Sequence, residues 1–199
     1  MSPHHTTALA AALAAALALV AGSAAAADAG TDTATKPSRF AQDPYPSTYR
    51  PIAAIRGEGT SNDYLPAEVP ALPAFALQRA VSTMVRDLGH DYWTGTVYTT
   101  NRRVWEHDDA FKRYLRTLRC MAIDMETATI FAAGFANRIP CGALLLVSDQ
   151  PMIPEGVKTE ASDARVSSEF VDRHVQIGIE ALKLIRRGGK SVRHLRFDE

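Results

Sequence analysis

The sequence predicts an α/β fold in which helices cover a central sheet. Short runs rich in β-branched and aromatic residues alternate along the chain with segments of helical periodicity. One run, Cys141–Val147, is continuously apolar, which is typical of a strand covered on both faces. Apolar residues make up 46% and charged residues 22% of the 199 residues, which excludes a chain that is disordered throughout.

The first predicted elements follow residue 50. The apolar run Pro51–Arg56 predicts a strand, and the polar residues Gly57–Asp63 predict a loop. Three prolines in Leu65–Pro73 favour extended or turning backbone. A helix is predicted from Ala74 to Gly89, with these apolar residues on one face: Leu77, Val81, Met84 and Leu88.

The second half of the chain continues the alternation. Trp93–Thr100 predicts a strand, and helices are predicted over Asp108–Arg119, Asp124–Ala136 and Asp163–Arg187. The last helix places Val166, Phe170, Ile177, Ala181 and Leu184 on one side and ends at Gly188. Because only three strands are clear, we expect short additional strands at 120–123 and 191–197.

The amino-terminal segment differs from the rest. Fourteen of the first 30 residues are alanine, and residues 1–27 contain no Asp, Glu, Lys or Arg. The apolar run Ala8–Val20 suits the hydrophobic part of a secretory signal and is shorter than the roughly 20 residues of a membrane span. An alanine-rich leader without an export role is the alternative, since no Lys or Arg precedes the run. Residues 28–50 predict a flexible linker, so the predicted folded domain is 51–199.

Charge and cysteine content exclude several functions. The chain has 22 Lys and Arg residues and 22 Asp and Glu residues, so its net charge is zero and predicts no nucleic-acid partner. The run Ala8–Val20 is too short for a membrane span, so we expect no stable membrane insertion. Two cysteines cannot form a disulfide-rich scaffold, and the six histidines show no metal-ligand spacing. We therefore expect no metal site.

The strongest candidate for chemistry is Asp149, which follows Ser148 at the end of the buried run. Open α/β sheets bind ligands at the carboxyl ends of strands, and apolar neighbours would raise the pKa of this carboxyl. Asp149 would then carry a proton at neutral pH. The alternative is an aspartate that opens a turn before Pro151.

Three weaker motifs accompany it. Asp124–Thr127 opens a predicted helix. Its carboxylates are either stabilised there by the helix dipole alone or also bind a hydroxylated ligand. Arg56–Ser61 contains glycines and a cation and could hold an anion. Tyr98 with Arg102 and Arg103 could stack a base and meet a phosphate, or be a buried tyrosine beside a solvated arginine pair. The sequence contains no G-x-S-x-G nucleophile motif.

Read in order, four segments carry a family resemblance: Ile52–Leu65, Tyr92–Trp105, Ala122–Ile130 and Gly142–Pro151. They resemble bacterial AMP nucleosidases of the nucleoside phosphorylase/nucleosidase superfamily. The resemblance runs from about Pro51 to the carboxyl terminus. It implies a nucleoside-phosphorylase-like sheet flanked by helices, homo-oligomers, no cofactor, and hydrolysis of AMP to adenine and ribose 5-phosphate.

The resemblance also implies roles for individual residues. Asp149 would be the general acid at the base, Glu126 would hold ribose hydroxyls, Met125 would pack on the sugar and Tyr98 would border the base. Ser148 belongs to the same shared motif and is a further candidate for substrate binding. Candidates for the 5′-phosphate are Arg56, Arg102, Arg103 and Lys158, which the sequence does not rank.

The sequence departs from the family before Ile52, where further strands and helices are expected. The leader and linker occupy that place, so the sheet is expected to lack its amino-terminal strands. The alternative function is therefore a truncated, inactive remnant or a nucleotide-binding module. The leader suggests export, whereas the resemblance suggests the cytoplasm.

Overall fold

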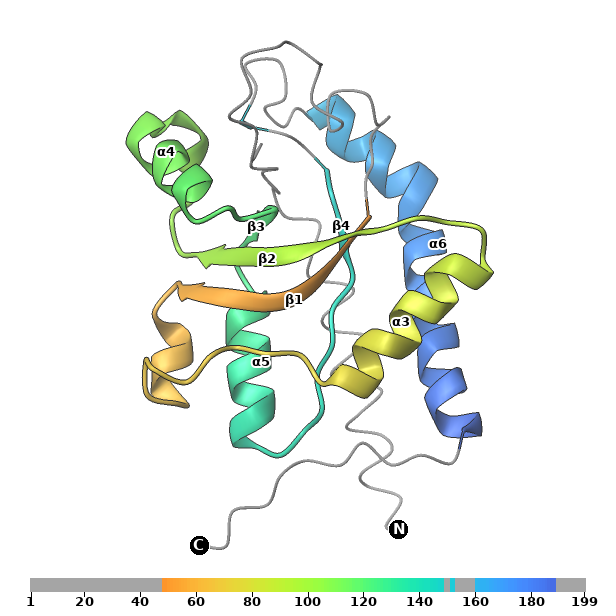
Figure 1. Cartoon of the computed structure of the whole chain (residues 1–199). Helices are drawn as coiled ribbons and strands as arrows, with labels where there is room; N and C mark the ends of the chain where they lie inside the picture. The colour runs from red at the N-terminus through yellow and green to blue at the C-terminus, as the bar shows by residue number, and fades with distance from the viewer. Residues whose placement is uncertain (1–47, 149–150, 153–159, 189–199) are drawn as a thin grey trace, which may run out of the picture.

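The protein forms a four-stranded mixed sheet flanked by helices (Figure 1). The computed structural model describes residues 48–148, 151–152 and 160–188. The strands are β1 (Thr48–Gly57), β2 (Trp93–Thr100), β3 (Ala122–Asp124) and β4 (Leu145–Leu146), in the order β3-β2-β1-β4. The helices are α3 (Phe75–Asp87), α4 (Asp109–Thr117), α5 (Thr127–Ala136) and α6 (Glu160–Arg187), with short 3-10 turns η1 (Thr60–Asp63) and η2 (Trp105–His107).

The first three strands run in the same direction. β1 pairs with β2, and β2 pairs with β3, in parallel, whereas β4 pairs antiparallel with the start of β1. β1 begins at Thr48, three residues before the predicted strand, because Tyr49 is buried and pairs with Leu145. The sequence-based prediction of an α/β sheet flanked by helices is confirmed.

Two helices pack together on one side of the molecule. α3 and α6 lie side by side in Figure 1, and they share an apolar cluster that includes Val81, Val85, Ile177 and Ala181. The predicted helical periodicity of α3 is confirmed at Leu77 and Val81, which are 1% exposed. Burial of each such side chain contributes about 1.5–3 kcal/mol, so the α3–α6 contact is a major part of the core.

Helix α5 packs against the parallel strands. Phe131 and Ala128 of α5 join Val97 of β2 and Ala122 of β3 in a second apolar cluster. Cys141 also belongs to it and lies so close to Gly134 that a Cβ there would stand 2.3 Å from its Sγ. Glycine at this position therefore lets the chain return tightly against α5.

Several predicted boundaries are corrected. The helix predicted from Asp124 begins at Thr127, because Asp124 itself ends β3. The predicted strand Cys141–Val147 is buried throughout, yet only Leu145–Leu146 pair as a strand. The short strand expected at 120–123 appears as β3, whereas 191–197 lies outside the described residues. Leu88 follows α3 and is 43% exposed.

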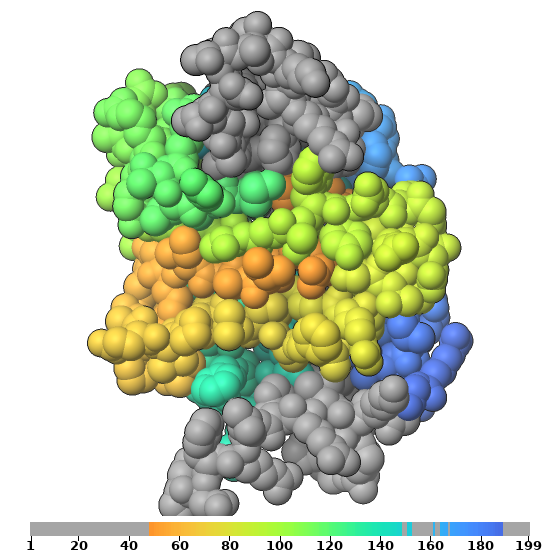
Figure 2. All heavy atoms as spheres, viewed as in Figure 1, coloured from red at the N-terminus to blue at the C-terminus, as the bar shows by residue number. Residues whose placement is uncertain are grey.

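The surface shows how the segment after β1 is held. In Figure 2 the residues that follow β1, coloured gold, form a continuous surface with β1 and α3. Ala71 in this segment bridges to Ala54 of β1 in an antiparallel sense.

Within the described ranges, no helix has the length and apolar character needed to cross a membrane.

Candidate active site

The carboxyl ends of the three parallel strands lie together at one edge of the sheet. Gly57, the last residue of β1, is in register with Thr100 of β2, and Thr99 is in register with Asp124 of β3. Since all three strands run in parallel, the residues that follow them emerge at the same edge. Open α/β sheets bind ligands at this edge, so the structure assembles a candidate site from segments far apart in the sequence.

A buried carboxylate ties two of these strands to α5. Asp124 is 2% exposed, and its Oδ1 accepts a hydrogen bond from Thr99 Oγ1 at 2.7 Å. Its Oδ2 accepts from the Thr127 backbone N–H at 3.2 Å and from Thr127 Oγ1. Burial raises the pKa of Asp124 to about 6, although the bonds from Thr127 and Thr99 act in the opposite direction.

Met125 and Glu126 lie between this anchor and α5, and both are half-buried. Glu126 occupies the N-cap position of α5, but its side chain makes no capping hydrogen bond. Its Oε2 accepts from the Met125 backbone N–H at 3.2 Å. Burial raises the pKa of Glu126 above its ordinary value. Its carboxylate is thus placed at the edge of the sheet without being committed to the helix.

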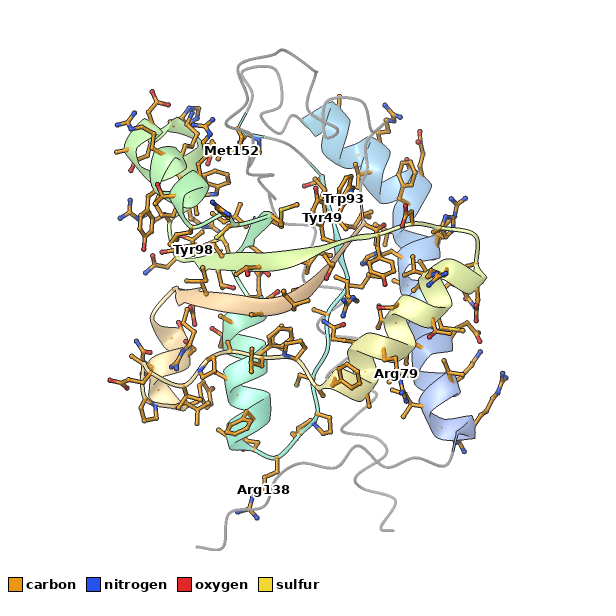
Figure 3. All side chains as sticks on the ribbon, in the orientation of Figure 1. Tyr49, Arg79, Trp93, Tyr98, Arg138 and Met152 are labelled. Atoms are coloured by element: carbon orange, nitrogen blue, oxygen red, sulfur yellow. The ribbon has the colours of Figure 1, made fainter. Side chains whose placement is uncertain are left out.

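Tyr98 lies in an aromatic cluster near the same edge, as labelled in Figure 3. Its ring contacts Phe111 edge-on at a centroid distance of 5.5 Å and Tyr114 at 6.3 Å. Burial raises the pKa of Tyr98, so the phenol stays protonated at neutral pH. A protonated, half-buried phenol can border an aromatic ligand and donate one hydrogen bond.

The guanidinium of Arg56 is fully used within the protein. Nε donates to Ser61 Oγ at 2.9 Å, and Nη2 donates to Asn62 Oδ1 and the Leu65 carbonyl at 2.8 and 2.7 Å. Nη1 donates to the carbonyls of Pro66 and Val69 at 2.5 and 2.7 Å. An arginine side chain has five N–H groups, so this geometry favours a structural role. A phosphate contact by Arg56 stays a prediction.

Glu58 is a buried carboxylate that sequence reasoning did not single out. Its Oε1 accepts from the Ser61 N–H at 2.9 Å and from Thr129 Oγ1 of α5 at 2.8 Å. Burial alone would raise the pKa of Glu58, but the hydrogen bonds from Ser61 and Thr129 lower it below its ordinary value. A buried negative charge here disfavours the predicted anion site in Arg56–Ser61.

The two arginines after β2 differ in their contacts. Arg102 forms an ion pair with Asp108 at 3.2 Å, and its guanidinium lies 4.6 Å from the Phe111 ring centroid. Arg103 is exposed, and its side chain makes no hydrogen bond or ion pair with the described part of the chain. Arg103 therefore has all its donors available for a ligand.

The last predicted site residues follow β4. Ser148 is buried at 2% exposure. It follows β4, which runs antiparallel to β1 and pairs with its first residues, so Ser148 lies where β1 begins and not at the carboxyl edge of the parallel strands. Asp149 and Lys158 lie outside the described residues, so their roles stay predictions. Met152, labelled in Figure 3, packs against the aromatic cluster that includes Tyr98, and its carbonyl accepts from Arg116 at 3.4 Å.

No metal centre is apparent in the part of the chain that the structure describes: no three or more His, Cys, Asp and Glu side chains lie together there. The polar groups at the edge are hydroxyl, carboxylate and phenol oxygens with arginine donors. Such groups can orient a hydroxylated, aromatic and anionic ligand by hydrogen bonds and charge.

Comparison with protein-family models identifies the family of this chain. The family model of the phosphorylase superfamily matches residues 19–185. The chain belongs to this superfamily. AMP nucleosidase from Escherichia coli is 34% identical over 146 residues, which cover 69% of this chain and 30% of that protein. Uridine phosphorylase from Treponema pallidum is 28% identical over 143 residues, or 66% of this chain and 53% of that protein.

Solved structures of superfamily proteins agree. AMP nucleosidase from Bacteroides thetaiotaomicron is 56% identical with a TM-score of 0.61, covering 71% of this chain and 56% of that one. Purine nucleoside phosphorylase from Toxoplasma gondii, at 19% identity and a TM-score of 0.61, shares the fold. The chain thus spans 30% of the length of the Escherichia coli relative. The predicted resemblance to AMP nucleosidases is confirmed.

Proposed function

We propose that this chain hydrolyses the N-glycosidic bond of AMP, giving adenine and ribose 5-phosphate. The observation that carries the proposal is the position of Glu126. Its half-buried carboxylate stands at the carboxyl edge of the parallel strands and makes no helix-capping bond. The 56% identity to an AMP nucleosidase of known structure supports AMP as the substrate.

The chemistry breaks the bond between the ribose anomeric carbon and adenine. Positive charge develops on the sugar, and the leaving base gains a proton, which Asp149 supplies as general acid. Water adds to the anomeric carbon and releases a proton to the solvent, and Asp149 regains a proton from the solvent, so atoms and charge balance. Glu126 accepts hydrogen bonds from ribose hydroxyls, and its negative charge stabilises the cationic sugar.

Neighbouring side chains position the substrate. Met125 packs on the sugar, and Tyr98 borders the base within its aromatic cluster. Among the described cations, Arg103 is the best candidate for the 5′-phosphate, because Arg56 and Arg102 already have partners. Lys158 remains a further candidate for the 5′-phosphate, and Ser148 remains a candidate for substrate binding. The whole enzyme is proposed to act as a homo-oligomer and to need no cofactor.

The test is incubation of the full chain with AMP, followed by chromatographic assay of adenine and ribose 5-phosphate. We expect both products without added phosphate, since water is the acceptor, and loss of both in Asp149→Asn. Asp172→Asn, an exposed carboxylate on α6, is the matched control and should retain activity. A strict requirement for inorganic phosphate would make the chain a phosphorylase instead.

The alternative is a nucleotide-binding module without catalysis. It would bind AMP in a calorimetric titration and release no adenine under any buffer condition. If the chain neither binds nor cleaves AMP, the proposed function is wrong.

A further inference from the structure

We propose that Asp124 is a positioning residue: it caps α5 in place of Glu126 and so keeps the Glu126 carboxylate available for ligand. The inference rests on the proposed function for the ligand's identity, a ribose with free hydroxyls. Its structural part depends only on how α5 begins.

The first N–H groups of a helix need acceptors outside the helix, and the N-cap side chain usually supplies one. In α5 the N-cap residue is Glu126, which makes no such bond. Asp124 Oδ2 instead accepts from the Thr127 N–H at 3.2 Å. Thr99 Oγ1 accepts from the Ala128 N–H at 2.9 Å while it donates to Asp124 Oδ1 at 2.7 Å.

These bonds form a connected set of side chains across three elements. Thr99 belongs to β2, Asp124 ends β3, and Thr127 begins α5. All three residues are buried, with 0%, 2% and 2% exposure. Buried networks with satisfied partners hold their members in one arrangement. The start of α5 is therefore fixed relative to the carboxyl edge of the sheet.

Met125 and Glu126 lie between the two anchored residues, Asp124 and Thr127. Consecutive Cα atoms lie about 3.8 Å apart, so two residues between fixed ends have little freedom. The Glu126 carboxylate is free of the capping task and turns back to accept from the Met125 N–H at 3.2 Å. Asp124 therefore holds the backbone at the start of α5, and the Glu126 carboxylate is left to bind the ribose hydroxyls.

The ionisation of Asp124 supplies a readout. Its pKa of about 6 means that the carboxylate is ionised at neutral pH and can accept from all its donors. Burial is the main cause of the raised pKa, and the negative charge of Glu126 adds to it. Below this pH the carboxyl carries a proton and loses part of its acceptor capacity, so its bonds from Thr127 and Thr99 weaken.

The test compares Asp124→Ala, which removes both acceptor oxygens, with Gln78→Met in the full chain. Gln78 is a buried residue whose Nε2 donates to the Pro51 carbonyl at 2.7 Å, which ties α3 to β1 away from the proposed site. Both variants should lower the unfolding temperature. Only Asp124→Ala should accelerate amide exchange at Thr127 and Ala128, by tenfold or more.

Kinetics separate positioning from stability. Asp124→Ala should lower kcat/KM for AMP roughly 10- to 100-fold, because misplacement of a reacting group by about 1 Å has effects of this size. It should also remove a titration near pH 6 from the pH profile. Gln78→Met should leave kcat/KM and the pH profile as in the wild type.

Each contrary outcome is decisive. Unchanged exchange at Thr127 and Ala128 would refute the capping role. Faster exchange with an unaltered kcat/KM and pH profile would refute the positioning role. If the wild type releases no adenine, the proposed function fails. Weaker AMP binding by Asp124→Ala in calorimetry then supports positioning, whereas equal or absent binding refutes it.

Discussion

The phenol ring of Tyr98 lies directly over the backbone of Gly57, across the paired strands β1 and β2. A Cβ built on Gly57 would stand 2.3 Å from both Cζ and Oη of Tyr98, a separation that no real contact allows. Tyr98 pairs in register with Ile55, two residues before Gly57. Glycine is therefore required here for close approach, and it fixes where the phenol lies at the proposed site.

Gly57→Ala should displace the Tyr98 ring and lower adenine release at least tenfold. Overpacking of this kind destabilises by about 1–3 kcal/mol, which urea denaturation would measure. Gly95→Ala is the matched control, since a Cβ there would stand 2.2 Å from the flexible Met121 side chain instead. Equal activity losses in both variants would argue against a specific role for the Tyr98 position.

Arg56→Lys should destabilise the segment that follows β1. The ammonium has three donors for the five bonds that Arg56 makes, so we expect a loss of about 2–4 kcal/mol. Limited proteolysis should then cut the chain within residues 60–70. Arg50→Lys is the control on the same strand. Among the described residues, the Arg50 side chain makes one hydrogen bond, to Thr94 Oγ1, and lies 5.5 Å from the centroid of the Tyr92 ring. Unchanged stability with selective loss of AMP binding would instead make Arg56 a phosphate ligand.

Arg103→Gln should raise KM for AMP roughly 10- to 100-fold, the size expected for loss of a hydrogen bond to a charged group. Binding of adenosine, which lacks the phosphate, should be unaffected. Arg173→Gln changes an exposed arginine on α6 and should alter neither ligand. An equal loss for AMP and adenosine would exclude a phosphate-specific role.

His174→Gln should change how stability depends on pH. His174 is buried on α6, and its Nε2 lies 2.8 Å from the Leu144 carbonyl. Burial lowers the pKa of His174, so the unfolded chain binds the proton more readily. Its contribution is complete above the unfolded value of 6.5 and is lost as the pH falls toward the folded pKa.

The measurement is the unfolding free energy of both proteins from pH 7.5 to pH 5. The wild type should lose stability relative to His174→Gln on acidification, since glutamine keeps a donor for Leu144 but does not titrate. Asp124 titrates in both proteins and cancels in the difference. A difference that stays constant with pH would show that His174 does not change its charge in this range.

The elements with strong local signals were predictable. Trp93–Thr100 is rich in β-branched and aromatic residues, and β2 has these same bounds. The period of Leu77 and Val81 predicts α3 because both side chains are buried. The sequence predicts Asp124 in a helix, whereas it ends β3. An acidic residue just before a helix gives the same sequence signal whether it ends a strand or begins the first turn.

Strand pairings and side-chain contacts between residues far apart in the sequence could not be predicted from local patterns. Cys141–Val147 reads as one strand, but its pairing depends on Thr48 and Tyr49, nearly one hundred residues earlier. The charge of Arg56 was visible, whereas the chain reversal that brings the Pro66 and Val69 carbonyls to it was not. The buried contact of Glu58 with Thr129 of α5 joins residues 71 positions apart, which no local pattern predicts.

The two cysteines have a practical consequence. Cys120 and Cys141 are buried at 2% and 8% exposure, and burial raises the pKa of each thiol to about 11. Alkylating reagents attack the thiolate, so both native thiols should resist maleimide while the protein is folded. A cysteine introduced on an exposed surface could then carry a fluorophore at a single site without removal of either native cysteine.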